Sequence, residues 1–180
     1  MLHTMIDIET LDTTPTAVVV SVAAAHFDPS NPDGVSTAEY WTLQLRPQLG
    51  SGRTVSEDTL KFWMRQEPKV QENTFLQKET WSPEEMFDEL SEYVHGTYVW
   101  GNGAGFDNTI LHNLSEQFLG EQAWPHWNDR CFRTFKGVFD PRGKLKPERV
   151  GKHDARADTL FQIDYFHNIV RENILEGYFS

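Results

Sequence analysis

Continuous apolar runs and one alternating segment occupy the first part of the chain, and they predict strands. Residues 2–9 and 17–27 are apolar runs of the kind typical of buried strands, and residues 38–45 alternate between apolar and polar positions. The turns between them, LDTTPT and DPSNPDG, are short enough to join antiparallel neighbours. We therefore expect three antiparallel strands before residue 46.

Beyond these strands the apolar spacing changes to the period of amphipathic helices. Ser56 is suited to cap a helix over 56–66, while Ser82, Pro83 and Gly96 mark the two ends of a helix over 82–96. The other expected elements are a strand at 97–101, a helix at about 107–119, a short element near 129–131, a helix to about 139 and a helix at about 154–173. This order predicts an α/β fold, with a mixed five-stranded sheet of three antiparallel strands and then parallel strands, flanked by helices.

Length and composition are those of one globular domain. The 180 residues contain no repeat and no long linker, so we expect a single domain over 1–180. Cys131 is the one cysteine, which excludes an internal disulfide and favours a reducing compartment. The longest apolar stretch, 17–27, is too short to span a bilayer and follows acidic residues. We expect a soluble cytoplasmic protein without a membrane partner.

Charge is distributed unevenly along the sequence. The formal net charge of −11 argues against broad, non-specific binding to nucleic acid. Residues 130–152 nevertheless carry a local charge of +6, which leaves −17 for the rest of the chain. The eight basic residues of this stretch are Arg130, Arg133, Lys136, Arg142, Lys144, Lys146, Arg149 and Lys152. A solvated loop would explain such a stretch, except that it runs directly into a cluster of acids.

Acidic residues recur at three places that the predicted layout brings together. Asp7 and Glu9 share one face of the first strand, Asp107 follows the Gly-rich turn GNGAGFDN, and His153 and Asp158 flank the start of the predicted 154–173 helix. Four carboxylates and an imidazole that face one cleft require cations. Because oxygen-rich sites select hard divalent ions, we expect Mg²⁺ or Mn²⁺.

Chance explains one of these motifs but not the other. An Asp-x-Glu is expected about once in a chain of this composition, so DIE alone carries little weight. The HDARAD segment contains His-x-Ala-x-x-Asp, for which about 0.02 occurrences are expected. The alternative interpretation, that these acids are only surface charge, is weakened by the order in which the motifs occur.

These residues carry a resemblance to a known family. Asp7 and Glu9 in DIET, Asp107 in GFDN, and His153 with Asp158 in HDARAD resemble the three motifs of the DEDDh 3′-5′ exonucleases. That family includes RNase T, oligoribonuclease and polymerase proofreading subunits. The segments TLKFWMRQ and WNDRCFRT resemble more narrowly the phage exonuclease A (DexA) group and its bacterial exoribonuclease relatives. The resemblance covers nearly the whole chain.

The resemblance implies an RNase H-like fold, two divalent metal ions and removal of nucleotides from a 3′ end. We assign Asp7 as the ligand shared by both ions, Glu9 and Asp158 to one ion, and Asp107 to the other. His153 is the expected general base, because a neutral imidazole accepts a proton near pH 7. The expected partner is therefore a single-stranded nucleic acid with a free 3′ end.

Candidate substrate contacts surround these motifs. Phe62 and Trp63 could stack on a base or pack in the core, and Leu11 could wedge against the last base or end a strand in the core. Many family members have Asn four residues before the middle Asp, where this chain has Gly103 and places Asn102 one position earlier. The substrate-contact candidates are Thr10, Leu11, Phe62, Trp63, Asn102, Arg130 and Arg133.

Two other functions compete with exonuclease activity. A metal-dependent phosphatase or nucleotide hydrolase would share the carboxylates but would close its pocket around one phosphate. A non-catalytic nucleic-acid-binding module would keep the basic stretch without the acids. The sequence does not decide between DNA and RNA, or between a monomer and a homodimer.

Overall fold

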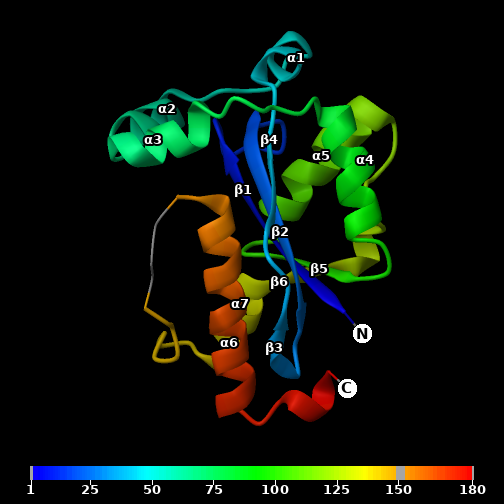
Figure 1. Cartoon of the computed structure of the whole chain (residues 1–180), viewed down its shortest axis with the longest axis vertical. Helices are drawn as coiled ribbons and strands as arrows, with labels where there is room; N and C mark the ends of the chain where they lie inside the picture. The colour runs from blue at the N-terminus through cyan, green and yellow to red at the C-terminus, as the bar shows by residue number, and fades with distance from the viewer. Residues whose placement is uncertain (1, 149–152, 180) are drawn as a thin grey trace.

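One mixed β-sheet with helices on both faces forms the protein, as the computed structural model shows for residues 2–148 and 153–179 (Figure 1). The strands are β1 (His3–Thr10), β2 (Val19–Asp28), β3 (Asn31–Val35), β4 (Glu39–Thr42), β5 (Tyr98–Gly101) and β6 (Asp129–Cys131). The helices are α1 (Leu45–Gly50), α2 (Glu57–Met64), α3 (Pro68–Phe75), α4 (Pro83–Tyr93), α5 (Asp107–Leu119), α6 (Phe132–Phe139) and α7 (Ala155–Glu172), with short 3₁₀ helices at His126–Asn128 and Glu176–Tyr178. Arg149 and Lys152 of the basic stretch lie outside the described residues.

Strand β1 lies at the centre of the sheet. It is antiparallel to β2 and parallel to β5, in the order β3-β2-β1-β5-β6, and β4 also pairs with β2. Ile6 and Ile8 belong to the apolar cluster shared with α4 and α5, while Met5 packs in the cluster shared with α6 and α7. Since side chains alternate along a strand, Asp7 and Glu9 lie on the α7 side of the sheet.

The predicted RNase H-like α/β class is confirmed, with one more strand than expected. Strand β3 forms within the segment that we read as the turn DPSNPDG, so the sheet has six strands instead of five. Pro32 and Gly34 disfavour a strand locally, but β3 pairs with Phe27 and Asp28 at the edge of the sheet. Pairing with the preceding strand β2 therefore decides this element.

Two short helices were also absent from the prediction, and the first replaces the end of a predicted strand. The strand expected at 38–45 ends at Thr42, and α1 follows. The Gln48 side chain fixes α1 to the sheet, since its Nε2 donates to the Val19 carbonyl and its Oε1 accepts from the Val19 amide, both at 2.8 Å. Helix α3 has Pro68 in its first turn and packs against β2.

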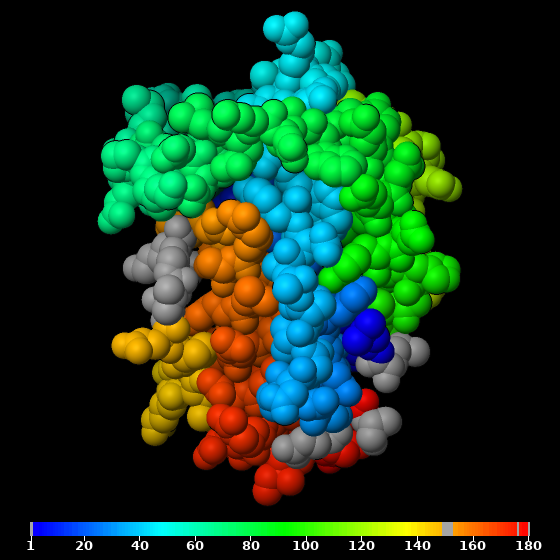
Figure 2. Space-filling view, viewed as in Figure 1, coloured from blue at the N-terminus to red at the C-terminus, as the bar shows by residue number. Residues whose placement is uncertain are grey.

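The helices that the capping signals predicted are present. Ser82 and Glu85 form a reciprocal capping box at the start of α4, and Ser56 accepts a hydrogen bond from the Thr59 amide at the start of α2. Helix α7, orange in Figure 2, runs beside the cyan segment that contains β3 and β4. No helix among the described residues has the length and apolar character that a membrane span requires.

Candidate active site

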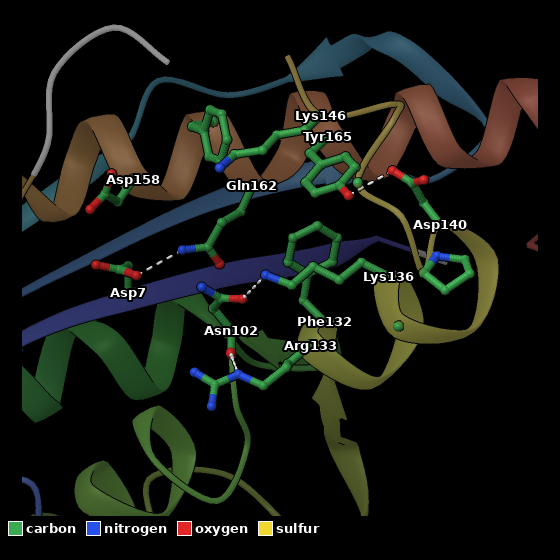
Figure 3. Close-up of a pocket in the computed structure, with 14 residues that line it drawn as sticks. Asp7, Asn102, Phe132, Arg133, Lys136, Asp140, Lys146, Asp158, Gln162 and Tyr165 are labelled. Carbon is green, nitrogen blue, oxygen red and sulfur yellow. Dashed lines mark hydrogen bonds between the residues drawn. The ribbon is translucent and has the colours of Figure 1, made fainter. Parts of the chain in front are cut away.

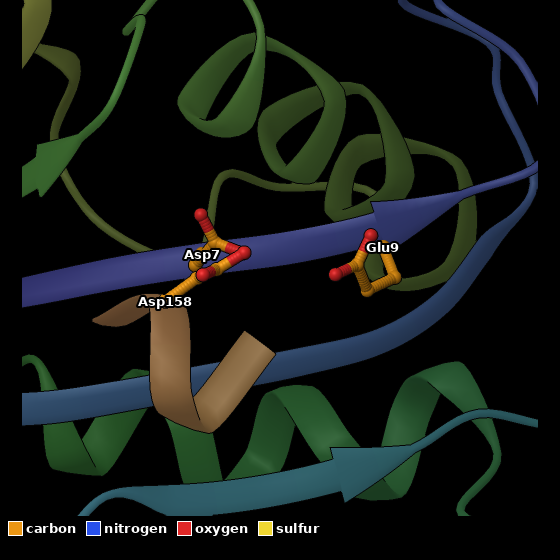
Figure 4. A group of neighbouring side chains, drawn as sticks. All are labelled: Asp7, Glu9 and Asp158. Carbon is orange, nitrogen blue, oxygen red and sulfur yellow. The ribbon is translucent and has the colours of Figure 1, made fainter. Parts of the chain in front are cut away.

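Three carboxylates lie close together, two from β1 and one from the first turn of α7. One oxygen each from Asp7, Glu9 and Asp158 lies within 4.8 Å of the others (Figure 4). Asp158 is placed by the first turn of α7, where the Asp154 side chain accepts hydrogen bonds from the Arg156 and Ala157 amides. The structure thus brings together the acids of the first and third sequence motifs.

Asp107 approaches the same place because a glycine ends β5. An ideal Cβ at Gly101 would lie 2.4 Å from Asn108 Oδ1 and 2.9 Å from Asp107 Cβ, so only glycine allows the first turn of α5 to come this close. The Asp107 side chain is buried, and its residue is only 4 % exposed. A small cavity of about 170 Å³ is lined by Asp7, Glu9, Asp107, His153 and Asp158, with Ile8, Asn102, Phe106 and Arg133. We call it the carboxylate cavity.

His153 stands directly before α7 in a left-handed backbone conformation, with φ of 60°. Its imidazole packs edge-on against two rings of α2, with centroid distances of 4.9 Å to Phe62 and 6.4 Å to Trp63. The predicted position in the loop before the helix is confirmed. The ring contacts hold the imidazole at one side of the carboxylates.

Buried acidic groups lie close together in the carboxylate cavity, which disfavours their charged forms. Burial raises the pKa of Asp7 well above its ordinary value, and the nearby charges of Asp107, Glu9 and Asp158 raise it further. Burial also raises the pKa of Asp107 to about 7, although the charge of Arg133 opposes this shift. A cation would relieve this repulsion, and an all-oxygen donor set suits Mg²⁺ or Mn²⁺. The residues present therefore fit the expected metal ions.

An aromatic groove adjoins the carboxylate cavity on the His153 side. It is lined by Ile8, Glu9, Thr10, Thr13, Asp58, Thr59, Phe62, Trp63, Phe106 and His153. Phe62 is 38 % exposed, whereas Trp63 is 4 % exposed and donates its Nε1 hydrogen to the Thr10 carbonyl. Phe62 is thus the more accessible of the two rings, and Trp63 supports the groove from the core.

Leu11 and Arg130 lie elsewhere. Leu11 is 7 % exposed and packs with Trp63 in a buried cluster, so it does not line the groove. The Arg130 guanidinium covers the Tyr98 ring at 3.8 Å and donates to the Trp127 and Asp129 carbonyls. Because Tyr98 begins β5 and the carboxylate cavity lies at its end, the structure does not bring Arg130 to the site.

Asn102 and Arg133 do lie at the site, beside side chains that sequence reasoning missed. Arg133 Nε donates to the Asn102 carbonyl at 2.9 Å, and Lys136 Nζ lies 2.8 Å from Asn102 Oδ1. Gln162 Nε2 donates to Asp7 Oδ1 at 2.7 Å (Figure 3). Gln162 follows Asp158 by four positions on α7, and this helical spacing was the signal that could have identified it.

Comparisons with known proteins agree with this geometry. Residues 2–170 match the model of a family described as the 3′-5′ exoribonuclease Rv2179c-like domain. No curated protein matches the sequence. Among solved structures, E. coli exonuclease I in complex with a dT13 oligonucleotide superposes with a TM-score of 0.68 at 15 % identity, over 98 % of this chain and 43 % of that one.

Other structures of exonuclease I show the same overlap. Its apo form gives a TM-score of 0.67 at 16 % identity, over 98 % of this chain and 44 % of that one. The zinc-bound E. coli complex with single-stranded DNA superposes with a TM-score of 0.69 at 14 % identity, over 98 % of this chain and 42 % of that one. The chain thus spans less than half the length of exonuclease I, and the likeness at this identity shows the fold. The narrower likeness to the phage exonuclease A group stays a prediction. The family match covers most of the chain, and the protein therefore belongs to the 3′-5′ exoribonuclease Rv2179c-like domain family.

Proposed function

We propose that the protein is a metal-dependent 3′-5′ exonuclease that releases nucleoside 5′-monophosphates from single-stranded 3′ ends, with one nuclease domain over residues 1–180. The observation that carries this proposal is the carboxylate cavity, where Asp7, Glu9, Asp107 and Asp158 meet His153. Family membership supports the same activity.

The four carboxylates would hold two divalent ions, Mg²⁺ or Mn²⁺. Glu9 and Asp158 would bind one, Asp107 the other, and Asp7 both, since Asp7 is the acid that the others surround. When bound, such a pair of ions activates a water and neutralises the charge that develops on the phosphoryl group and the leaving oxygen. Arg133, whose charge acts on Asp107, adds a positive group beside the scissile phosphate.

His153 would take the proton from the attacking water. A neutral imidazole is suited to this role near pH 7. The edge-on contacts with Phe62 and Trp63 fix the ring on the aromatic-groove side of the carboxylates. The water therefore attacks from that side.

The aromatic groove would receive the terminal nucleotide. The exposed face of Phe62 can stack on its base, which contributes roughly 1–3 kcal/mol in single-strand binders. Thr10, which lines the same groove, lies where the sugar of this nucleotide would pass. Leu11 supports this wall from the core through its contact with Trp63.

The shape of the site favours a polymer over a single phosphate. The carboxylate cavity shares lining residues with the aromatic groove and with a cavity of about 480 Å³ that is also lined by Asp7 and Asp158. A phosphatase or mononucleotide hydrolase would need a pocket closed around one phosphate. The family description names exoribonucleases, so we propose single-stranded RNA as the preferred substrate. E. coli exonuclease I has been crystallised with dT13 and dA16, and single-stranded DNA is the alternative.

The test uses matched 5′-labelled RNA and DNA oligomers, single- and double-stranded, with Mg²⁺. We expect a ladder that shortens from the 3′ end, faster on single strands and on RNA, and release of 5′-monophosphates. Hydrolysis of mononucleotides without shortening of any oligomer would instead establish the phosphatase function.

A further inference from the structure

A second cavity adjoins the carboxylates on the side away from His153. It measures about 480 Å³ and lies between α6 and α7 (Figure 3). We call it the α6–α7 cavity. It is lined by Asp7, Asn102, Phe132, Arg133, Lys136, Gly137, Asp140, Pro141, Gly143, Lys146, Asp158, Phe161, Gln162 and Tyr165. Neither His153 nor Glu9 is among these residues, so the cavity and the aromatic groove flank the carboxylates from two sides.

Cations and rings dominate the wall of the α6–α7 cavity beyond the carboxylates. Lys136 and Arg133 lie beside Asn102, and Lys146 Nζ lies 5.8 Å from the centre of the Phe161 ring. The Asp140 carboxylate of the same wall accepts hydrogen bonds from the Tyr165 hydroxyl and from two backbone amides of its own loop. Such a wall suits a phosphate with a sugar and a base.

Gln162 supplies an independent sign of a ligand. The residue is 3 % exposed, and its Nε2 donates a hydrogen bond to Asp7 Oδ1. Its Oε1 is buried and has no hydrogen-bond partner among the described residues. Because a buried acceptor without a donor destabilises a fold, such an atom in a cavity wall indicates a donor that arrives with a ligand.

The direction of the reaction identifies that ligand, provided that the proposed exonuclease function holds. In-line displacement places the attacking water and the leaving oxygen on opposite sides of the phosphorus. The water lies on the His153 side, so the leaving 3′-oxygen points to the α6–α7 cavity. That oxygen belongs to the penultimate nucleotide, which stays on the strand. In RNA its 2′-hydroxyl is the immediate neighbour of the leaving oxygen.

We infer that the α6–α7 cavity binds the penultimate ribonucleotide, with Lys136 and Lys146 on its 5′-phosphate and Gln162 Oε1 accepting a hydrogen bond from its 2′-hydroxyl. One amide would then touch both the catalytic Asp7 and the sugar of the retained strand. This contact would make Gln162 a determinant of the preference for RNA.

A pair of RNA substrates tests the hydroxyl contact. One is all-ribose, and the other has a single 2′-deoxyribose at the penultimate position; the readout is kcat/KM for the first cleavage. The wild-type protein should cleave the deoxy substrate roughly 2- to 12-fold more slowly, the value of one net hydrogen bond. Gln162→Met keeps the length of the side chain but lacks the acceptor, and it should bring this ratio to about one.

A purely positioning role for Gln162 gives a different result. If Gln162→Met slows both substrates equally and the ratio persists, Gln162 only orients Asp7 and the hydroxyl contact is wrong. Equal cleavage of both substrates by the wild-type protein would also overturn it. Failure to cleave either substrate would instead refute the proposed function, so the two failures are distinct.

The phosphate contact has its own test, which does not depend on cleavage. Lys146→Glu should weaken binding of a single-stranded RNA in EDTA, measured by fluorescence anisotropy, and should lower the slope of log K against log salt by about 0.7. Lys144→Glu is the matched control, since Lys144 is exposed on the same loop and does not line the cavity. If both substitutions change the affinity and the salt slope equally, Lys146 contributes only general positive charge, and its assignment to the 5′-phosphate is wrong.

Discussion

The Asp7 carboxylate lies between Gln162 and the other acids of the site. It accepts a hydrogen bond from Gln162. Burial, and then the charges of three other acids, raise its pKa. Such a group is costly in the metal-free protein, because the folded state must keep negative charges close together away from water. Acidic groups that destabilise the metal-free fold in this way are expected at a functional site.

His153→Ala should slow the release of nucleotides by roughly 10²- to 10⁴-fold, the usual contribution of a general base. Affinity for Mn²⁺, measured by calorimetry, should change little, because the carboxylates supply the ligands. His126→Ala, an exposed histidine outside the site, is the control. A lost Mn²⁺ affinity in His153→Ala would make the imidazole a metal ligand instead of a base.

Asp107→Asn should stabilise the metal-free protein above pH 7 and not at acidic pH. Burial raises the pKa of Asp107 from 3.8 to about 7, so the folded state favours the protonated form. The stability that this group contributes is complete below pH 3.8 and is lost as the pH rises through 7. Thermal unfolding in EDTA at pH 5 and pH 8 measures the difference.

The neutral amide of the Asp107→Asn variant does not titrate, so it loses no stability as the pH rises. The Tm advantage of Asp107→Asn over wild type should therefore grow from pH 5 to pH 8. Asp88→Asn, an exposed site on α4, should leave the pH dependence of Tm as in wild type. A constant advantage at both pH values would show that the Asp107 carboxylate is not strained by its surroundings.

The positions of single side chains were predictable where a local sequence pattern determined them. Alternation along β1 predicted that Asp7 and Glu9 share a face, and the position before α7 predicted that His153 can turn toward Asp158. Arg130 was not predictable in this way, because the stacking of its guanidinium on Tyr98 depends on the pairing of β6 with β5.

At the scale of elements, the junction between β5 and α5 determines where Asp107 stands. Asn108 Nδ2 donates to the Val99 carbonyl and to Asp129 Oδ1, which ties the first turn of α5 to both β5 and β6. Gly101 leaves the room for this close approach. The position of the Asp107 carboxylate thus depends on a residue without a side chain.

Gly101→Ala should displace the start of α5 and lower kcat/KM about 10²-fold, the effect of a misplacement of about 1 Å at a reacting group. The free energy of unfolding should fall by about 1–3 kcal/mol, as for other overpacked sites. Gly105→Ala in the same turn meets nothing within 4 Å and should behave like wild type in both measurements. A fully active Gly101→Ala would show that α5 can shift without moving Asp107.

Elements with strong end signals were predictable, and elements that depend on backbone partners outside their own segment were not. Helix α4 carries a complete capping box, which its sequence displays. Strand β3 and helix α1 form from a poor local sequence because β2 offers them backbone partners. The α6–α7 cavity belongs to the second kind, because it requires the packing of α6 against α7.

At the scale of the whole molecule, metal binding and folding should be coupled. The proposed Mg²⁺ ions would bind the folded carboxylate cavity and not the unfolded chain, so Mg²⁺ should raise Tm, by the equivalent of about 2.7 kcal/mol at 100 times its Kd. The rise should be larger at pH 8 than at pH 6, because ions must displace protons from Asp7 and Asp107. Differential scanning fluorimetry across Mg²⁺ concentrations measures both effects.

Asp7→Ala should abolish both the Mg²⁺-dependent rise in Tm and the hydrolysis of RNA. Its Tm in EDTA should equal or exceed that of wild type, since the buried carboxyl group that the neighbouring acids repel is gone. Substantial hydrolysis by this variant would contradict the assignment of Asp7.

The hydrogen bond from Gln162 to Asp7 joins residues 155 positions apart. A ribosome adds roughly 5 to 20 residues per second, so Asp7 is synthesised on the order of ten seconds before the helix that completes its surroundings. The growing chain carries β1 and its two acids, but neither the base nor the fourth carboxylate. The proposed hydrolysis of RNA therefore requires that α7 has been made and packs against β1.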